Sequence, residues 1–188
     1  TQSTQLTISV TALGWIEQGQ AITRASAQVG DHICVSGQVG DAAFGLQHLG
    51  HPLQQRLDYP TPRCQLGQQL KGLASSMIDV SDGLAQDLGH ILKASNVGAK
   101  LSLDQLPIDT SLKELDLRQA WHYALAGGDD YELCFTIPKE HQRLMEQQTE
   151  ALPYPITCIG EITANNHLEL LYADGSPFIG TSHGYQHF

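Results

Sequence analysis

Several short stretches of the chain alternate hydrophobic and polar residues, which is the pattern of a half-buried β-strand. Residues 6–13 alternate apolar with hydroxyl side chains, and residues 31–36 form a second stretch of this kind. Further strands are predicted at 73–80, 100–103, 131–137 and 156–162, with hairpin-like strands near 168–172 and 177–180. The strand at 6–13 begins almost at the first residue, so we expect the chain to start inside a larger protein.

Apolar residues at helical spacing separate these strands. They recur at i, i+4, i+7 and i+8 over about 83–95, which predicts an amphipathic helix there. The helix predicted over about 41–49 has one face made by Ala42, Ala43, Leu46 and Leu49. Further helices are predicted over 64–72, 112–126 and 138–150, and an exposed, Pro-containing connection over 51–65. Helices and strands intermingle without an internal repeat, so the sequence predicts an α+β or mixed α/β fold.

Composition excludes several classes of function. The chain has 188 residues, a formal net charge of -10 and only 10 Lys and Arg residues, which are scattered. This argues against nucleic acid and anionic membranes as partners, because clustered Lys and Arg bind phosphate groups. No apolar stretch is long enough to span a bilayer, and the first residues lack a signal-peptide pattern. The four cysteines lie far apart without a C-x-x-C motif, which favours buried, reduced thiols in a cytoplasmic protein.

The most informative segment is an acidic turn between the strand at 73–80 and the following helix. Asp79 and Asp82 are three residues apart, so both carboxylates can reach the same end of the strand. Mg²⁺ takes one or two such carboxylates and completes its shell with water and phosphate. Ser81 and Gly83 lie at the helix N-terminus, where free N–H groups favour a phosphate. The alternative is structural, with Ser81 or Asp82 as the N-cap and Asp79 as a turn residue.

A second acidic turn precedes the strand at 131–137. Gly127 and Gly128 can end the preceding helix and let the backbone approach a ligand closely. Asp129 and Asp130 then repel one another unless a cation or positive ligand lies nearby. The alternative is a glycine cap followed by solvated acids.

Other chemistry receives little support from the sequence. Gly37, Gly40 and Asp41 follow a strand but fit neither a dinucleotide nor a P-loop motif, so a tight turn is predicted. Zinc is disfavoured because the nine histidines include no H-E-x-x-H motif. The sequence also lacks a G-x-S-x-G elbow for a serine nucleophile.

Six segments occur in one order along the chain: residues 19–24 (GQAITR), 30–31 (GD), 36–41 (SGQVGD), 78–91 (IDVSDGLAQDLGHI), 127–135 (GGDDYELCF) and 184–188 (GYQHF). Together they resemble thiamine-monophosphate kinases. The resemblance implies the two-domain fold of the aminoimidazole-ribonucleotide synthetase superfamily, with nucleotide and substrate between the domains. Residues 1–25 would be a remnant of the N-terminal ATP-binding domain and linker, and residues 26–188 the C-terminal α/β domain. The full-length protein would be a homodimer, since family members dimerise through strands of the N-terminal domain.

The resemblance also implies roles for individual residues. Asp79 and Asp82 would be Mg²⁺ ligands, while Ser81 and Arg24 would contact ATP. The acid after the two glycines would contact the substrate, and here it is Asp129 where the family usually has Glu. Relatives place an aromatic residue against the substrate rings at a position held here by Ser182. Stacking is then either lost or taken up by Tyr185.

The implied reaction transfers the γ-phosphate of ATP to thiamine monophosphate and yields thiamine diphosphate and ADP. A phosphate monoester has a second pKa of about 6, so the acceptor oxygen is already ionised at neutral pH and no general base is needed. Each pair of unit charges at about 4 Å repels by roughly 4 kcal/mol at an effective dielectric constant of about 20. Mg²⁺ held by carboxylates would offset this repulsion.

Three alternatives to this reaction stay open. One is a relative of the same superfamily, such as an ATP-dependent purine-pathway ligase or a selenophosphate synthetase. The second is a non-catalytic domain that binds Mg²⁺ or nucleotide, and the third is a dimerisation or structural domain that binds neither. Because the resemblance places half of the site in a domain outside this chain, we expect the isolated chain to be inactive.

Overall fold

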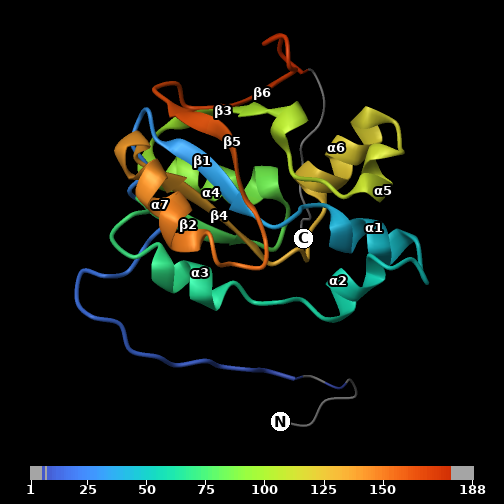
Figure 1. Ribbon diagram of the computed structural model, residues 1–188, viewed down its shortest axis with the longest axis horizontal. Helices are drawn as coiled ribbons and strands as arrows, with labels where there is room; N and C mark the ends of the chain where they lie inside the picture. Colours follow the sequence, from blue (N-terminus) through green and yellow to red (C-terminus); the bar gives the residue numbers. More distant parts are fainter. Residues whose placement is uncertain (1–5, 7, 179–188) are drawn as a thin grey trace.

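A six-stranded sheet organises the computed structural model, which describes residue 6 and residues 8–178 (Figure 1). The strands are β1 His32–Ser36, β2 Ser76–Val80, β3 Gly98–Ser102, β4 Glu132–Ile137, β5 Ile156–Thr163 and β6 Leu168–Leu171. Their order across the sheet is β2-β4-β1-β5-β3-β6, and all neighbours are antiparallel except β3 and β6. β1 and β5 therefore occupy the middle of the sheet, and β4 lies between β1 and β2, the strand that ends at the first acidic turn.

The pairing of β1 with β5 contains a β-bulge. Ile33 pairs with Gly160, whereas the next residue, Cys34, pairs with Cys158, so Ile159 is the extra residue. The bulge brings Ile159 and Ile162 into the same buried cluster, although they are three positions apart on one strand.

Helices cover both faces of the sheet. The helices are α1 Asp41–Gln47, α2 Gln54–Asp58, α3 Cys64–Gln69, α4 Leu84–Ser95, α5 Thr110–Lys113, α6 Leu117–Ala126 and α7 Gln142–Thr149, with 3-10 turns at Leu103–Gln105 and Lys139–His141. The larger core joins α4 and α6 to the face of β1 that carries Ile33 and Val35. The smaller core joins α3 and α7 to the opposite face, which carries Cys34, Phe135 and Ile137.

The sequence pattern predicted most of these elements but not all of them. The helix expected over 112–126 is two helices, because Asp109 and Asp116 each accept a hydrogen bond from a backbone N–H and begin a new helix. The connection expected over 51–65 contains the short helix α2. Of the strand expected near 177–180, Pro177 forms an isolated bridge with Leu171, and residues 179 and 180 lie outside the described part of the chain.

The strand predicted at 6–13 was wrong for the residues that the structure describes there. Residues 8–13 form no strand and are exposed to solvent. A segment with alternating side chains forms a strand only where a partner strand supplies the backbone hydrogen bonds. None of the described strands pairs with this segment.

The face predicted for the helix at 41–49 is confirmed only in part. Ala42, Ala43 and Leu46 together border an open cleft that is described below, but α1 ends at Gln47, before Leu49. Leu46 and Leu49 are exposed, and the buried residues of α1 are Asp41, Ala42, Phe44 and Gly45. The expectation for the cysteines holds only in part, because Cys34 and Cys134 are buried but Cys64 is exposed and Cys158 is partly exposed.

Candidate functional site

The first acidic turn is held in shape by a buried carboxylate from the helix that follows it. Asp87 of α4 accepts hydrogen bonds from the backbone N–H groups of Ser81 (2.9 Å) and Asp82 (3.0 Å). The helix begins after Gly83, which has φ 120° and makes no side-chain cap bond. The interpretation of Ser81 or Asp82 as the N-cap is therefore wrong. Both side chains lie at the end of β2, where the Asp82 carboxylate accepts a hydrogen bond from the side chain of Gln86 (3.3 Å).

The second acidic turn packs directly against the first. The N–H of Asp129 donates to the carbonyl of Ser81 (2.9 Å), and the N–H of Tyr131 donates to the carbonyl of Val80 (2.8 Å). A Cβ on Gly128 would lie 2.5 Å from the Ser81 carbonyl oxygen, so this approach requires glycine. Asp129 and Tyr131 both have positive φ (67° and 51°), a strained conformation for non-glycine residues. The two turns thus form one unit.

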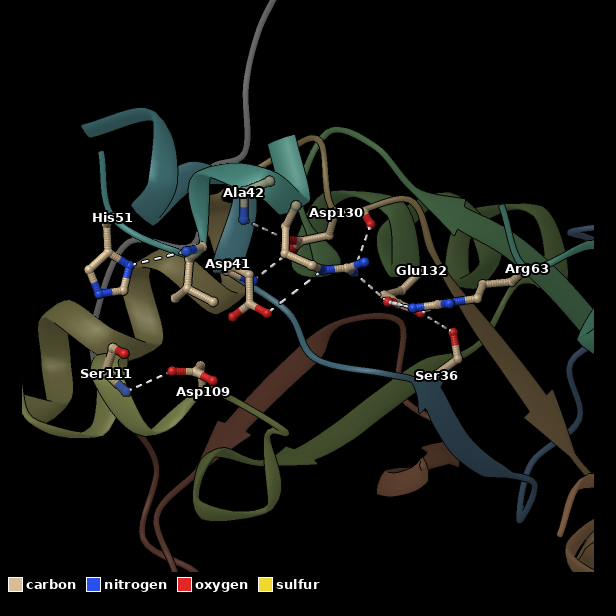
Figure 2. A network of polar contacts seen from close by, with 12 residues as sticks. Ser36, Asp41, Ala42, His51, Arg63, Asp109, Ser111, Asp130 and Glu132 are labelled. Carbon is tan, nitrogen blue, oxygen red and sulfur yellow. Dashed lines mark hydrogen bonds and ion pairs between the residues drawn. The ribbon is translucent and has the colours of Figure 1, made fainter. Parts of the chain in front are cut away.

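Asp130, between the two strained residues, ties this unit to α1. Its carboxylate is buried and accepts from the backbone N–H groups of Gly40 (2.7 Å) and Ala42 (3.2 Å), as Figure 2 shows for Ala42. Burial raises the pKa of Asp130 to about 8, against the lowering effect of these two hydrogen bonds. Burial also raises the pKa of Asp41 to about 7, although Arg56 lies 3.8 Å away. Gly37 and Gly40, both with positive φ, form the predicted turn before this helix.

Glu132, the next acid along the chain, is fully buried and paired with two arginines (Figure 2). Arg56 donates to Glu132 Oε1 (2.6 Å), and Arg63 donates through Nε to Oε2 (2.6 Å) and through a second nitrogen to Oε1. Ser36 donates its hydroxyl to the same carboxylate. Arg63 also lies over the ring of Tyr154, with 3.9 Å between the guanidinium carbon and the ring centroid. The interpretation of this segment as solvated acids is wrong for Asp130 and Glu132.

Sequence reasoning missed Arg56 and Arg63. They belong to the segment that we expected to be an exposed connection. The signal that could have found them is an acid at the first position of a buried strand, since a buried carboxylate needs a positive partner. Three of the ten Lys and Arg residues lie between β1 and β2, and Arg56 and Arg63 are two of these three.

Four of the predicted site residues line one hollow of about 330 Å³: Arg24, Asp79, Ser81 and Asp82. Asp87 and His90 complete its polar wall. The Asp79 carboxylate is exposed at the end of β2 and makes no hydrogen bond or ion pair with another described residue. Burial raises the pKa of Asp87, and the nearby charges of Asp82 and Asp79 raise it further. Hard oxygen donors in a field of surplus negative charge suit a hydrated Mg²⁺ ion.

The described residues hold no preformed centre of three or more His, Cys, Asp or Glu side chains. Mg²⁺ requires only one or two protein carboxylates and takes its other ligands from water and phosphate. Asp79 and Asp82 are therefore compatible with such an ion but do not enclose it.

A larger cleft of about 860 Å³ opens beside this hollow and shares Ser81 and Asp82 with it. Asp129 and Tyr131 form one wall of the cleft, and α1 and α6 form the others. The hydroxyl of Tyr131 donates to Asp129 Oδ1 (3.1 Å), so the exposed carboxylate is oriented at the cleft. The structure thus brings Asp129 next to the predicted phosphate-binding residues. Ser182 and Tyr185 lie outside the described residues.

This sheet order, with two acidic turns joined at one end, defines a domain of the class found in AIR synthase-related proteins. Residues 29–173 match the family described as AIR synthase related protein, C-terminal domain. The chain belongs to this family, as the resemblance in the sequence indicates. None of the described helices is long and apolar enough to cross a membrane.

Within the family, the chain is similar to thiamine-monophosphate kinases. It is 45% identical over 197 residues to the thiamine-monophosphate kinase of Haemophilus influenzae, with 97% of this chain and 60% of the relative covered. The crystal structure of thiamine-monophosphate kinase from Stenotrophomonas maltophilia K279a matches with a TM-score of 0.79 and 41% identity, over 87% of this chain and 56% of that chain. A structure described as AaThiL complexed with AMPPCP and TMP matches with a TM-score of 0.72 and 30% identity, over 89% of this chain and 54% of that chain. The chain therefore spans a little over half the length of these relatives.

Proposed function

We propose that this chain forms the C-terminal part of an ATP-dependent kinase that phosphorylates thiamine monophosphate to thiamine diphosphate. The observation that carries the proposal is the union of the two acidic turns, in which Asp129 N–H donates to the Ser81 carbonyl. That union sets a substrate cleft containing Asp129 beside a hollow containing Arg24, Asp79, Ser81 and Asp82. The similarity to thiamine-monophosphate kinases, including a relative bound to AMPPCP and TMP, supports the same reaction.

The residues of the hollow would bind and orient the polyphosphate of ATP. Arg24 carries the positive charge at its rim, and the Ser81 hydroxyl has no hydrogen-bond partner among the described residues. Both groups can donate to phosphate oxygens. Because the Ser81 and Asp82 N–H groups are already bound to Asp87, side chains rather than these two amides do this work.

Asp79 and Asp82 would hold Mg²⁺. When bound, the ion would supply positive charge that offsets the repulsion between the acceptor phosphate and the γ-phosphate. The acceptor is a phosphate monoester that is mostly ionised at neutral pH, so the chain needs no general base at this position. The contribution of the protein is then positioning and electrostatic stabilisation.

Asp129 would contact the cationic part of thiamine monophosphate from the wall of the cleft next to Ser81. Its carboxylate is one methylene shorter than the usual Glu, and the positive φ of Asp129 together with the Tyr131 hydroxyl sets its direction. Ser182 is the other proposed substrate contact. Residues 1–25 would belong to the N-terminal domain and linker and residues 26–188 to the C-terminal domain, so a longer protein would complete the site and would act as a homodimer.

The test is Mg²⁺-dependent formation of thiamine diphosphate from ATP and thiamine monophosphate. We expect no turnover with this chain alone and turnover with the longer protein that includes an N-terminal domain. In that longer protein, Asp82→Asn should lower turnover by about tenfold or more, because one carboxylate ligand is lost. The matched control is Glu140→Gln, an exposed acid outside both the hollow and the cleft.

Each other outcome revises a specific part of the proposal. Turnover by the short chain would overturn the inference that half of the site is missing. Unchanged turnover in Asp82→Asn would remove this residue from the metal site. Binding of ATP and Mg²⁺ without turnover of thiamine monophosphate in the longer protein would favour a non-catalytic domain or another ATP-dependent enzyme of the superfamily. Absence of both binding and turnover would favour a structural or dimerisation domain.

A further inference from the structure

Two cysteines face one another across the middle of the sheet. Cys34 of β1 and Cys158 of β5 are directly paired residues of neighbouring antiparallel strands, and their Sγ atoms are 2.7 Å apart. Directly paired antiparallel residues have Cα atoms about 4.5–5.5 Å apart, within the span of about 4.4–6.8 Å that a disulfide bridges. Both are free thiols in this structure.

The two sulfur atoms differ in their access to solvent. Cys34 is fully buried in the smaller core, beside Phe135. Cys158 is partly exposed and lines a surface hollow of about 530 Å³ together with Glu146 and Tyr154. A reagent in the hollow can therefore reach Cys158 directly, whereas it can reach Cys34 only through Cys158.

The surroundings of the two thiols also shift their pKa values in opposite directions. The hydrogen bond from Cys34 is the main cause that lowers the pKa of Cys158 to about 6, and His32 lowers it further, while burial and Glu146 oppose this. The same hydrogen bond and burial raise the pKa of Cys34. A reachable thiolate beside a second thiol is the arrangement of a redox-sensitive cysteine and its resolving partner.

We propose that Cys34 and Cys158 form a reversible disulfide by exchange with a small-molecule disulfide that enters the hollow at Cys158. In the first step, the Cys158 thiolate attacks one sulfur of the reagent, a mixed disulfide forms, and one reagent thiolate leaves. In the second step, Cys34 attacks the Cys158 sulfur, the mixed disulfide breaks, and the second reagent thiolate leaves with the Cys34 proton. The protein loses two electrons, and the reagent disulfide is reduced to two thiols.

The test is oxidation of the folded chain with oxidised glutathione, followed by alkylation of the remaining thiols after unfolding, proteolysis and mass spectrometry. A Cys64→Ser background removes the exposed cysteine that would otherwise react separately. Three thiols remain in that background, and we expect oxidation to leave one, the buried Cys134. The product should be a cross-linked pair of peptides containing Cys34 and Cys158, and dithiothreitol should reverse it.

Two further variants distinguish the roles of the pair. In Cys34→Ala, the glutathione adduct should accumulate on Cys158, because no second thiol can displace it. In Cys158→Ser, Cys34 should stay reduced, with circular dichroism confirming that the variant is folded. Recovery of Cys34 and Cys158 as fully alkylated thiols after oxidation of the parent would overturn the proposal. A stable Cys158 adduct in the parent, without the cross-link, would overturn it as well.

Discussion

Replacing Glu132 by glutamine removes one charge from the buried cluster beneath the second acidic turn. Glutamine keeps the shape and nearly the volume of the side chain, so the substitution tests the charge rather than the packing. The Glu132 side chain is 0% exposed, the Arg63 side chain 8% and the Arg56 side chain 23%. After the substitution, Arg63 would keep a charge without a counter-ion, whereas Arg56 lies nearer to water.

The expected cost follows from this burial. Removing one partner of a buried ion pair destabilises a protein by about 3–5 kcal/mol, because the other charge is left uncompensated. Arg56 can recover part of its hydration and glutamine can accept one hydrogen bond, so we expect the lower end, about 3 kcal/mol. Domains of this kind have a total stability of about 5–15 kcal/mol, so the loss is large but leaves the variant folded.

Urea unfolding followed by tryptophan fluorescence measures this change. Trp121 is buried in the larger core while Trp15 is fully exposed, so the change in emission reports the environment of Trp121. The matched control is Glu161→Gln. Glu161 pairs with Lys139 at 3.0 Å with both side chains about half exposed, and exposed pairs contribute only about 0–1 kcal/mol.

A specific result would refute this reasoning. If Glu132→Gln and Glu161→Gln lower the free energy of unfolding by the same amount, below about 1 kcal/mol, the two arginines do not depend on Glu132 for their burial. An unchanged m-value in both variants is required for the comparison, since m reports the surface exposed on unfolding.

Three further predictions concern the residues around the joined turns. Asp41, whose pKa burial raises to about 7, keeps a proton that the unfolded chain releases near pH 4. Its contribution to the free energy of unfolding should therefore fall as pH rises from 4 to 7, by up to about 1.4 kcal/mol per pH unit. Asp41→Asn should make the urea-unfolding profile less steep over that range, while the slope due to Asp130 remains. Gly128→Ala places a Cβ 2.5 Å from the Ser81 carbonyl oxygen and should lower the free energy of unfolding in urea by about 1–3 kcal/mol. The control Gly89→Ala, with no neighbouring atom within 4 Å, should not destabilise the chain. Equal effects of the two substitutions would contradict the close contact of the turns. Asp87→Ala leaves two backbone N–H groups of the first turn without their acceptor and should cost about 2 kcal/mol by the same measurement, while an unchanged midpoint would show that the turn holds its shape without Asp87.

Local patterns in the sequence predicted the elements that carry their own periodicity. The helix expected over 83–95 is α4 Leu84–Ser95, and its apolar positions are buried as the spacing requires. The strand expected at 31–36 is β1, displaced by one residue at its start. The clustering of Asp79, Ser81 and Asp82 was also predictable, because these residues lie on one short turn.

Contacts between distant segments were not predictable in the same way. Arg56 and Arg63 reach Glu132 from about seventy residues away in the sequence, and pairing at that separation leaves no periodic signal. The strand order likewise depends on pairings between remote segments, such as β1 with β5. The failure at residues 6–13 has the same origin, since alternation describes a side-chain pattern and says nothing of the partner strand.

The bulge in β5 divides that strand into two halves, in which the even-numbered residues lie on opposite faces of the sheet. Ile156 and Cys158 face the smaller core, yet Gly160 pairs with Ile33 and Ile162 lies in the larger core, although all four positions are even-numbered. Removing Ile159 would restore a regular ladder in which Cys158 and Gly160 keep the faces of their partners Cys34 and Ile33. It would also take one fully buried side chain out of the larger core. The bulge therefore lets one strand serve both cores by adding a single residue, whose side chain fills the larger of the two.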